Sequence, residues 1–230
     1  MLFRSMSEKF TLAYQLKELN VSGKQAREIS RRIQQSYDES WRHHHNYLHI
    51  LDMLKTASRE AADWLDEADI PALFWAIIFN DIVYIPSRED NEESSVRVMK
   101  TIMAKFKRNR IFFWRSNNKL DELIGRVEQL IMLTKTHKYS DHDRVGQMLV
   151  YCDMRILAQP KDIYEAYAAN IEKEYYHLSP EAFNKGRIEW LEKTLERGKT
   201  EPILPFKLDT DGNEKLNMTD ELHRRKQLVR

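Results

Sequence analysis

Four of the chain's eight histidines lie within seven positions, at His43, His44, His45 and His49. Imidazole binds transition metals and exchanges protons near neutral pH, so this segment is a candidate metal site. His45 and His49 are four residues apart, a spacing that stacks two side chains on one face of a helix. One of them would then hold a metal while the other faces a substrate. The alternative is that the run is a solvated surface patch.

Two acids in apolar segments are candidate partners for the histidines. Asp81 and the preceding Asn80 follow the most apolar segment, residues 73–79, and Asp153 is the one acid in the apolar run 148–156. Burying an ionised carboxylate without a partner is costly, so each acid needs a cation or hydrogen bonds. A metal shared with the histidines would satisfy both. Backbone amides of the following loop would also satisfy Asp81.

A further candidate lies at the end of a helix expected over residues 120–134. This helix would deliver Thr134 and His137 at its C-terminal end. His137 could approach the same pocket as Asp81, or it could compensate the negative end of the helix dipole. The sequence leaves both interpretations open.

The elements that must position these residues are helices, because apolar residues recur at three-and-four spacing. We expect helices over about 7–19, 22–39, 47–65, 70–79, 90–106, 120–134 and 145–157, from 160 onward, and over 180–198 and 216–229. Within the helix expected from residue 70, segment 73–79 is apolar on every face, as in a central buried helix, and Pro71 lies in the first turn. Strand-like alternation is almost absent, and six glycines and six prolines are few for 230 residues. The fold class is therefore predicted to be all-α.

The charge balance limits the expected partners. The 37 basic and 36 acidic residues give a formal charge of +1, which favours neither nucleic acid nor an anionic membrane, although a local basic patch stays open. The basic run 105–110 precedes aromatic residues that could stack on bases or could pin a loop to the core. The single cysteine, Cys152, and the lack of a signal-like start or a bilayer-length apolar run predict a cytoplasmic protein. We expect no nucleic-acid or membrane partner, and the oligomeric state stays open.

Together these residues resemble the HD-domain metal-dependent phosphohydrolases, and most closely the branch of predicted HD superfamily phosphohydrolases. The resemblance covers about residues 40–200 and rests on segments in the family's order: His45-Asn46-Tyr47-Leu48-His49-Ile50, Phe79-Asn80-Asp81 with Val83-Tyr84, Asp90-Asn91-Glu92, Thr134 to His137, Asp153 with Ile156-Leu157, and Tyr175-Tyr176 ahead of Pro180. It implies an HD-domain-like helical bundle. We expect one such domain over residues 1–198, followed by an irregular segment and a charged C-terminal helix over 199–230.

The resemblance also implies roles at the site. A divalent metal (Mn, Zn, Fe or Mg) would be held by His49, Asn80, Asp81 and Asp153. His45 would protonate the leaving oxygen, because the first segment also looks like the first metal motif of cyclic-nucleotide phosphodiesterases. Asp81 would serve in catalysis as well. Contacts to the substrate, or support for the ligands, would come from Arg42, Tyr84, Asp90, Asn91, Glu92, Thr134 and His137. The implied partner is a small phosphorylated ligand, a nucleotide or another phosphate ester.

The chain departs from the family at Asn80, where the His-Asp pair that names the family has its histidine. An amide oxygen is a weaker ligand than imidazole for zinc, iron or manganese and suits harder cations. Disturbing even an outer partner of a metal costs about 10- to 100-fold in affinity or activity, so losing a ligand should cost at least that. Three functions remain: a phosphohydrolase impaired at this position, a catalytically inactive HD-fold protein that binds a ligand or regulates, or an interaction module that uses the aromatic-rich loop and the charged C-terminal helix.

Overall fold

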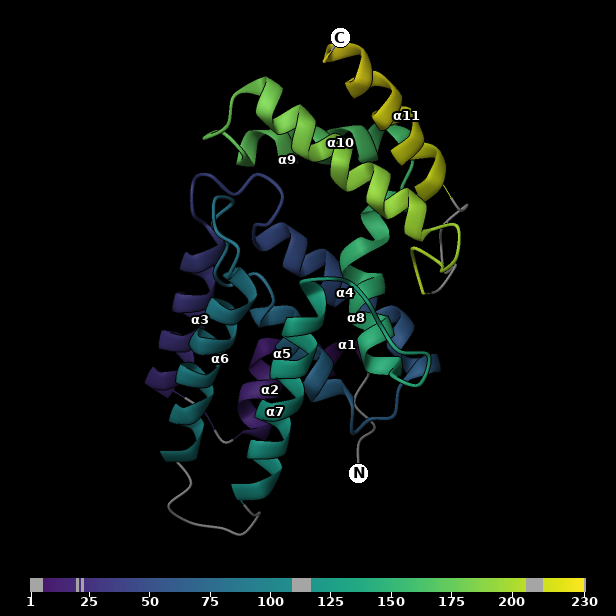
Figure 1. Ribbon diagram of the computed structural model, residues 1–230. Helices are drawn as coiled ribbons and strands as arrows, with labels where there is room; N and C mark the ends of the chain where they lie inside the picture. Colours follow the sequence, from purple (N-terminus) through teal and green to yellow (C-terminus); the bar gives the residue numbers. More distant parts are fainter. Residues whose placement is uncertain (1–5, 20, 22, 109–116, 206–212, 230) are drawn as a thin grey trace. The chain divides into compact units, whose positions relative to one another are not determined.

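The computed structural model describes residues 6–19, 21, 23–108, 117–205 and 213–229, and this part of the chain contains helices and no strand. The predicted all-α class is therefore confirmed for these residues. The chain divides into two compact units, residues 1–152 and 153–230, and Figure 1 labels their helices. The predicted boundary at residue 198 stays a prediction. None of the described helices is both long and apolar enough to cross a membrane.

The first unit is built around one buried helix. Its elements are α1 (Met6–Lys9), α2 (Leu12–Glu18), α3 (Gly23–Tyr37), α4 (Tyr47–Trp64), α5 (Ile70–Phe79), α6 (Asn91–Arg108), α7 (Asn117–Thr134) and α8 (Arg144–Met154), whose last two residues belong to the second unit. Every side chain of α5 from Ala72 to Phe79 is buried, and α4, α6 and α7 pack against it (Figure 1). The prediction of a central helix over 70–79 is confirmed.

Two predicted helices differ from the structure. The expected helix 7–19 is two helices, α1 and α2, because Thr11 is extended and caps α2: its hydroxyl accepts a hydrogen bond from the Tyr14 amide at 3.2 Å. The expected helix 145–157 ends as α-helix at Met154 and continues as the 3-10 helix η1 (Arg155–Ala158). Such a tightened turn is common at helix ends. The predicted aromatic loop, residues 111–114, lies outside the described residues.

The second unit contains η1, α9 (Lys161–Glu174), α10 (Pro180–Arg197) and α11 (Glu214–Leu228). A buried ionic network joins its helices: the Glu221 carboxylate accepts hydrogen bonds from Tyr164, Arg187 and Arg225. Burial alone would raise the pKa of Glu221, but the bonds and charge of Arg187 lower it to about 2. The C-terminal helix is thus fixed to α9 and α10 by hydrogen bonds and matched charges.

Gly146 lies where α8 comes closest to its neighbours. A Cβ at this position would lie 2.7 Å from Asp143 Oδ2 and 3.0 Å from Leu133 Cδ1, and Asp143 is held by an ion pair with Arg126. We expect Gly146→Ala to lower the free energy of unfolding by about 1–3 kcal/mol, because overpacking forces neighbours to shift. Urea denaturation followed by circular dichroism measures this.

The matched control is Gly125→Ala in α7, where a Cβ meets nothing within 4 Å. It should raise stability by up to about 1 kcal/mol, since alanine is the better helix former. Equal stability of the two variants would contradict the close packing inferred at Gly146.

Candidate metal centre

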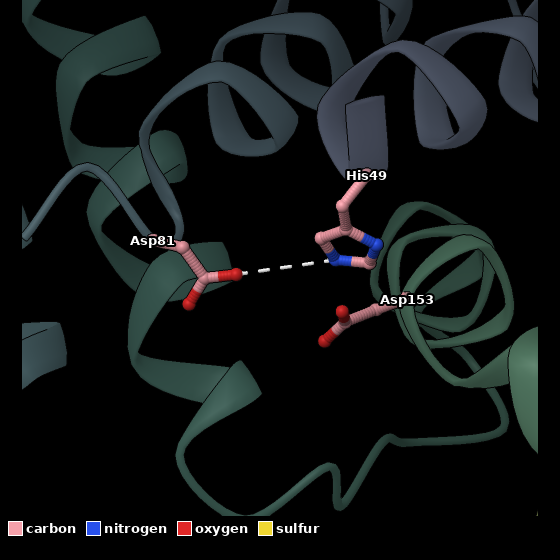
Figure 2. A group of neighbouring side chains, drawn as sticks. All are labelled: His49, Asp81 and Asp153. Atoms are coloured by element: carbon pink, nitrogen blue, oxygen red, sulfur yellow. Dashed lines mark ion pairs between the residues drawn. The ribbon is translucent and has the colours of Figure 1, made fainter. Parts of the chain in front are cut away.

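Three residues far apart in the sequence bring ligand atoms together. His49, Asp81 and Asp153 each offer one atom, and these atoms all lie within 4.8 Å of one another. His49 Nε2 lies 4.0 Å from Asp81 Oδ2. Figure 2 shows the imidazole and both carboxylates facing a common space. The side chain of His49 is 6% exposed and that of Asp81 is 21% exposed, so the group is largely withdrawn from solvent.

Helix ends position all three side chains. His49 is in the first turn of α4, where the Asn46 side chain caps the helix by accepting hydrogen bonds from the amides of Leu48 at 2.9 Å and His49 at 3.4 Å. Asp81 follows α5 directly after Asn80, and Asp153 is the penultimate residue of α8. Asp153 takes its place from α8, of which all but the last two residues belong to the first unit.

The donor set suits a divalent cation. Imidazole and carboxylate ligands bind zinc, manganese and iron, and carboxylates also bind magnesium. Ligands on opposite sides of such a cation are about 4 Å apart, given bond lengths of about 2.1 Å. Separations of up to 4.8 Å therefore require only small side-chain movements to close around an ion. The group could hold a metal, and its geometry leaves the identity of that metal open.

Asn80 lies beside this group with an unsatisfied oxygen. Its side chain is buried, and Nδ2 donates to Asp81 Oδ2 at 3.3 Å. Within the described part of the chain, Asn80 Oδ1 is buried and accepts no hydrogen bond. An unmet buried acceptor costs about 1–3 kcal/mol. If the amide were flipped, Oδ1 would face the Asp81 carboxylate, and the two oxygens would repel each other. A cation or a water molecule next to Oδ1 would satisfy this acceptor without that repulsion.

Arg42 holds the backbone on which two site residues depend. Its Nη1 donates to the carbonyl oxygens of His45 at 2.9 Å and Asp81 at 2.8 Å. Its Nε donates to Glu39 Oε2 at 2.9 Å, and the arginine side chain is fully buried. The guanidinium carbon lies 5.6 Å from the centroid of the Tyr84 ring. These contacts place Arg42 behind the ligands, as a support.

Two further imidazoles border His49. His45 precedes α4, and its ring stacks on Tyr84 with centroids 4.1 Å apart and lies 6.0 Å from the His49 ring. The His44 ring lies 4.6 Å from His49 and 4.8 Å from His45. No role was assigned to His44 from the sequence, although its place in a run of histidines was a signal. His45 does not share a helical face with His49, because α4 begins after it.

Glu92, in the first turn of α6, interacts electrostatically with Asp81. Burial raises the pKa of Glu92, and the negative charge of Asp81 raises it further, whereas Lys135 opposes the shift. Lys135 donates to Glu93 Oε1 at 2.6 Å. Sequence reasoning did not single out Lys135, because only the packing of α6 and α7 brings it near this acid.

The other predicted residues lie in neighbouring loops and turns, and none belongs to the three-residue group found in the described chain. Asn91 organises the loop after α5: its side chain exchanges two hydrogen bonds with the backbone of Ile85, each 3.0 Å long. A hydrogen bond from Arg88 lowers the pKa of Asp90. The Thr134 hydroxyl donates to the Ile131 carbonyl at 2.7 Å. His137 has a positive φ of 52°.

Replacing Arg42 tests its supporting role. We expect Arg42→Lys to lower the affinity for Mn²⁺ by about 10-fold or more, as loss of an outer support does, because one ammonium lacks the planar fork that reaches several carbonyls. Isothermal titration calorimetry measures the affinity. Arg97→Lys is the control, at an arginine whose side chain is 64% exposed. Unchanged affinity in a folded Arg42→Lys protein would contradict the role.

We compared the chain with protein-family models, with curated proteins and with solved structures. No family model, curated protein or solved structure matched it. The features that support a function are thus the side chains gathered around His49, Asp81 and Asp153.

Proposed function

We propose that this chain is a metal-dependent phosphohydrolase of the HD-domain type, acting on a nucleotide or another small phosphate ester. The observation that carries the proposal is the convergence of His49, Asp81 and Asp153 to within 4.8 Å. Residues so far apart in the sequence form such a group only through folding. One imidazole and two carboxylates are also a donor set that phosphate-cleaving metal sites can use.

Different residues of the chain would bind the metal and donate the proton. A bound divalent cation would lower the pKa of the attacking water and neutralise charge on the phosphoryl oxygens. His49, Asp81 and Asp153 would hold that cation, and Asn80 offers a neutral oxygen beside them. His45 would give a proton to the leaving oxygen, since its ring lies next to His49 and the stack on Tyr84 orients it.

Glu92 would act at the edge of the same site. It is half-buried near Asp81, and both burial and that charge favour its protonated form. Its position would let it influence the charge around Asp81. Glu92 would therefore act beside the metal ligands and would not replace one of them.

A second candidate function is ligand binding without turnover. Asn80 favours it, because an amide in place of an imidazole weakens the hold on a transition metal. Such a protein would bind phosphorylated ligands at the same group of side chains and release them unchanged. Binding of a nucleotide without formation of product distinguishes this candidate from the enzyme.

Substitution of Asp81 tests the enzyme directly. We expect Asp81→Asn to reduce Mn²⁺-dependent phosphatase activity by about 100-fold or more, since it removes a direct ligand. The assay measures phosphate released from nucleotides and from p-nitrophenyl phosphate. Asp141→Asn, in the exposed loop before α8, should keep full activity. Activity that survives in Asp81→Asn would belong to a contaminant and would count against the enzyme.

Restoring a histidine at Asn80 tests whether the pocket is otherwise intact. We expect Asn80→His to raise zinc occupancy by about 10-fold or more, because imidazole is a good zinc ligand. Elemental analysis after removal and replacement of metal measures occupancy. Asn170→His, on α9, is the control and should bind no additional zinc. Occupancy unchanged by Asn80→His would show that the geometry does not admit a fourth ligand.

A further inference from the structure

Two hollows flank α3, and neither shares a lining residue with the metal centre. The larger, of about 740 Å³, lies between α2 and α3 over the buried side chains of Leu16 and Val21. The smaller, of about 330 Å³, lies between α3 and α6 over the buried Ile29 and Ile102. Both floors are apolar, so both hollows can receive apolar side chains.

The rims of these hollows are strongly basic. The lining residues include six cations and one acid: Lys17, Lys24, Arg27, Arg31, Arg32, Lys105 and Glu28. Their formal charge is +5, whereas the whole chain carries +1. Glu28 already forms an ion pair with Arg31, whose Nη2 lies 3.0 Å from Glu28 Oε1. Among the described residues, the side chains of the other five cations form no hydrogen bond or ion pair, so they are available to a partner.

The shape and composition of this face discriminate between classes of anionic partner. Single-stranded nucleic acid binds through aromatic side chains on which bases stack, and none of the described residues that line the two hollows is aromatic. A membrane-surface helix inserts protruding apolar side chains into the bilayer. Within the described parts of α2, α3 and α6, no large apolar residue is exposed. The apolar surface is recessed, so it must receive apolar groups from its partner.

We infer that the face formed by α2, α3 and α6 docks an acidic amphipathic helix of a partner protein. Apolar side chains of that helix enter the two hollows, and its carboxylates pair with the basic rims. Lys24, Arg27 and Arg31 follow the three-and-four spacing of one helical stripe, which extends about 10 Å along α3. Carboxylates at the same spacing on a partner helix would meet them in register. This surface is independent of the metal centre and of any reaction there.

A selection from a random peptide library tests the chemistry of the partner. The full chain is immobilised and used to select 16-residue peptides displayed on phage, with counter-selection on the Arg27→Glu/Arg32→Glu variant. We expect the enriched peptides to be acidic and to carry apolar residues three and four apart. Enrichment of basic or neutral peptides, or no enrichment that depends on these arginines, would overturn the inference.

Calorimetry with the most enriched peptide, made synthetically, then tests the surface. We expect Arg27→Glu/Arg32→Glu to weaken its binding by at least about 10-fold, because each reversal places like charges together. Arg27→Gln/Arg32→Gln should weaken it less, and both should keep the native circular dichroism. The control Lys185→Glu/Lys193→Glu reverses two exposed cations of α10 and should leave binding unchanged.

Two further probes separate the other anionic partners. A 20-nucleotide single-stranded RNA and phosphatidylserine vesicles are each titrated into the same proteins. We expect both to bind more weakly than the peptide. Tighter binding of either probe that is lost in Arg27→Glu/Arg32→Glu would show that this face recognises nucleic acid or lipid, and the inference of a protein partner would be wrong.

Discussion

One buried guanidinium links the two loops that form the candidate metal centre. Arg42 donates to the carbonyl oxygens of His45, Asp81 and Ile82, so the loop before α4 and the loop after α5 share one donor group. Removing this donor would leave buried carbonyl oxygens without a partner, at a cost of about 1–3 kcal/mol for each. The spacing between His49 and Asp81 therefore depends on Arg42 as well as on the two helices.

Side-chain hydrogen bonds also satisfy carbonyl groups near the buried end of the apolar helix α5. The last carbonyl groups of a helix have no partner within it, and burying them unmet is unfavourable. Near the end of α5, the Tyr37 hydroxyl donates to the Ile78 carbonyl at 2.9 Å, and Arg42 meets the Asp81 carbonyl. The side chains that donate hydrogen bonds to carbonyl oxygens near the buried end of α5 thus also fix the backbone that carries the Asp81 carboxylate. The fold and the site share these donors, and this explains how a polar pair can follow so apolar a helix.

Features that depend on residues close together in the sequence could be predicted, whereas features that depend on distant residues could not. Apolar spacing predicted α5 and the start of α4 near Tyr47, because the spacing of apolar residues within one segment shows which face of a helix is buried. The break at Thr11 was missed, since a single side-chain cap outweighed a continuous helical pattern. Residue type and apolar context singled out His49, Asp81 and Asp153, which the folded chain brings together as a group that could hold a metal ion. The hydrogen bonds from Arg42 to Asp81 and Ile82 join residues about 40 positions apart, so only the folded chain reveals them.

Two groups of charged side chains in the described part of the chain differ in their balance of acids and bases. In the second unit, Glu221 meets Arg187 and Arg225, and Arg225 also pairs with Glu172. Two cations face two acids there, which suits a structural network. The group at His49, Asp81 and Asp153 contains two carboxylates and one imidazole, so its acids outnumber its one basic side chain. A divalent cation would balance that excess, and the oxygen of Asn80 beside it would gain a partner. The charge within the group is what favours a metal site over a structural ion pair.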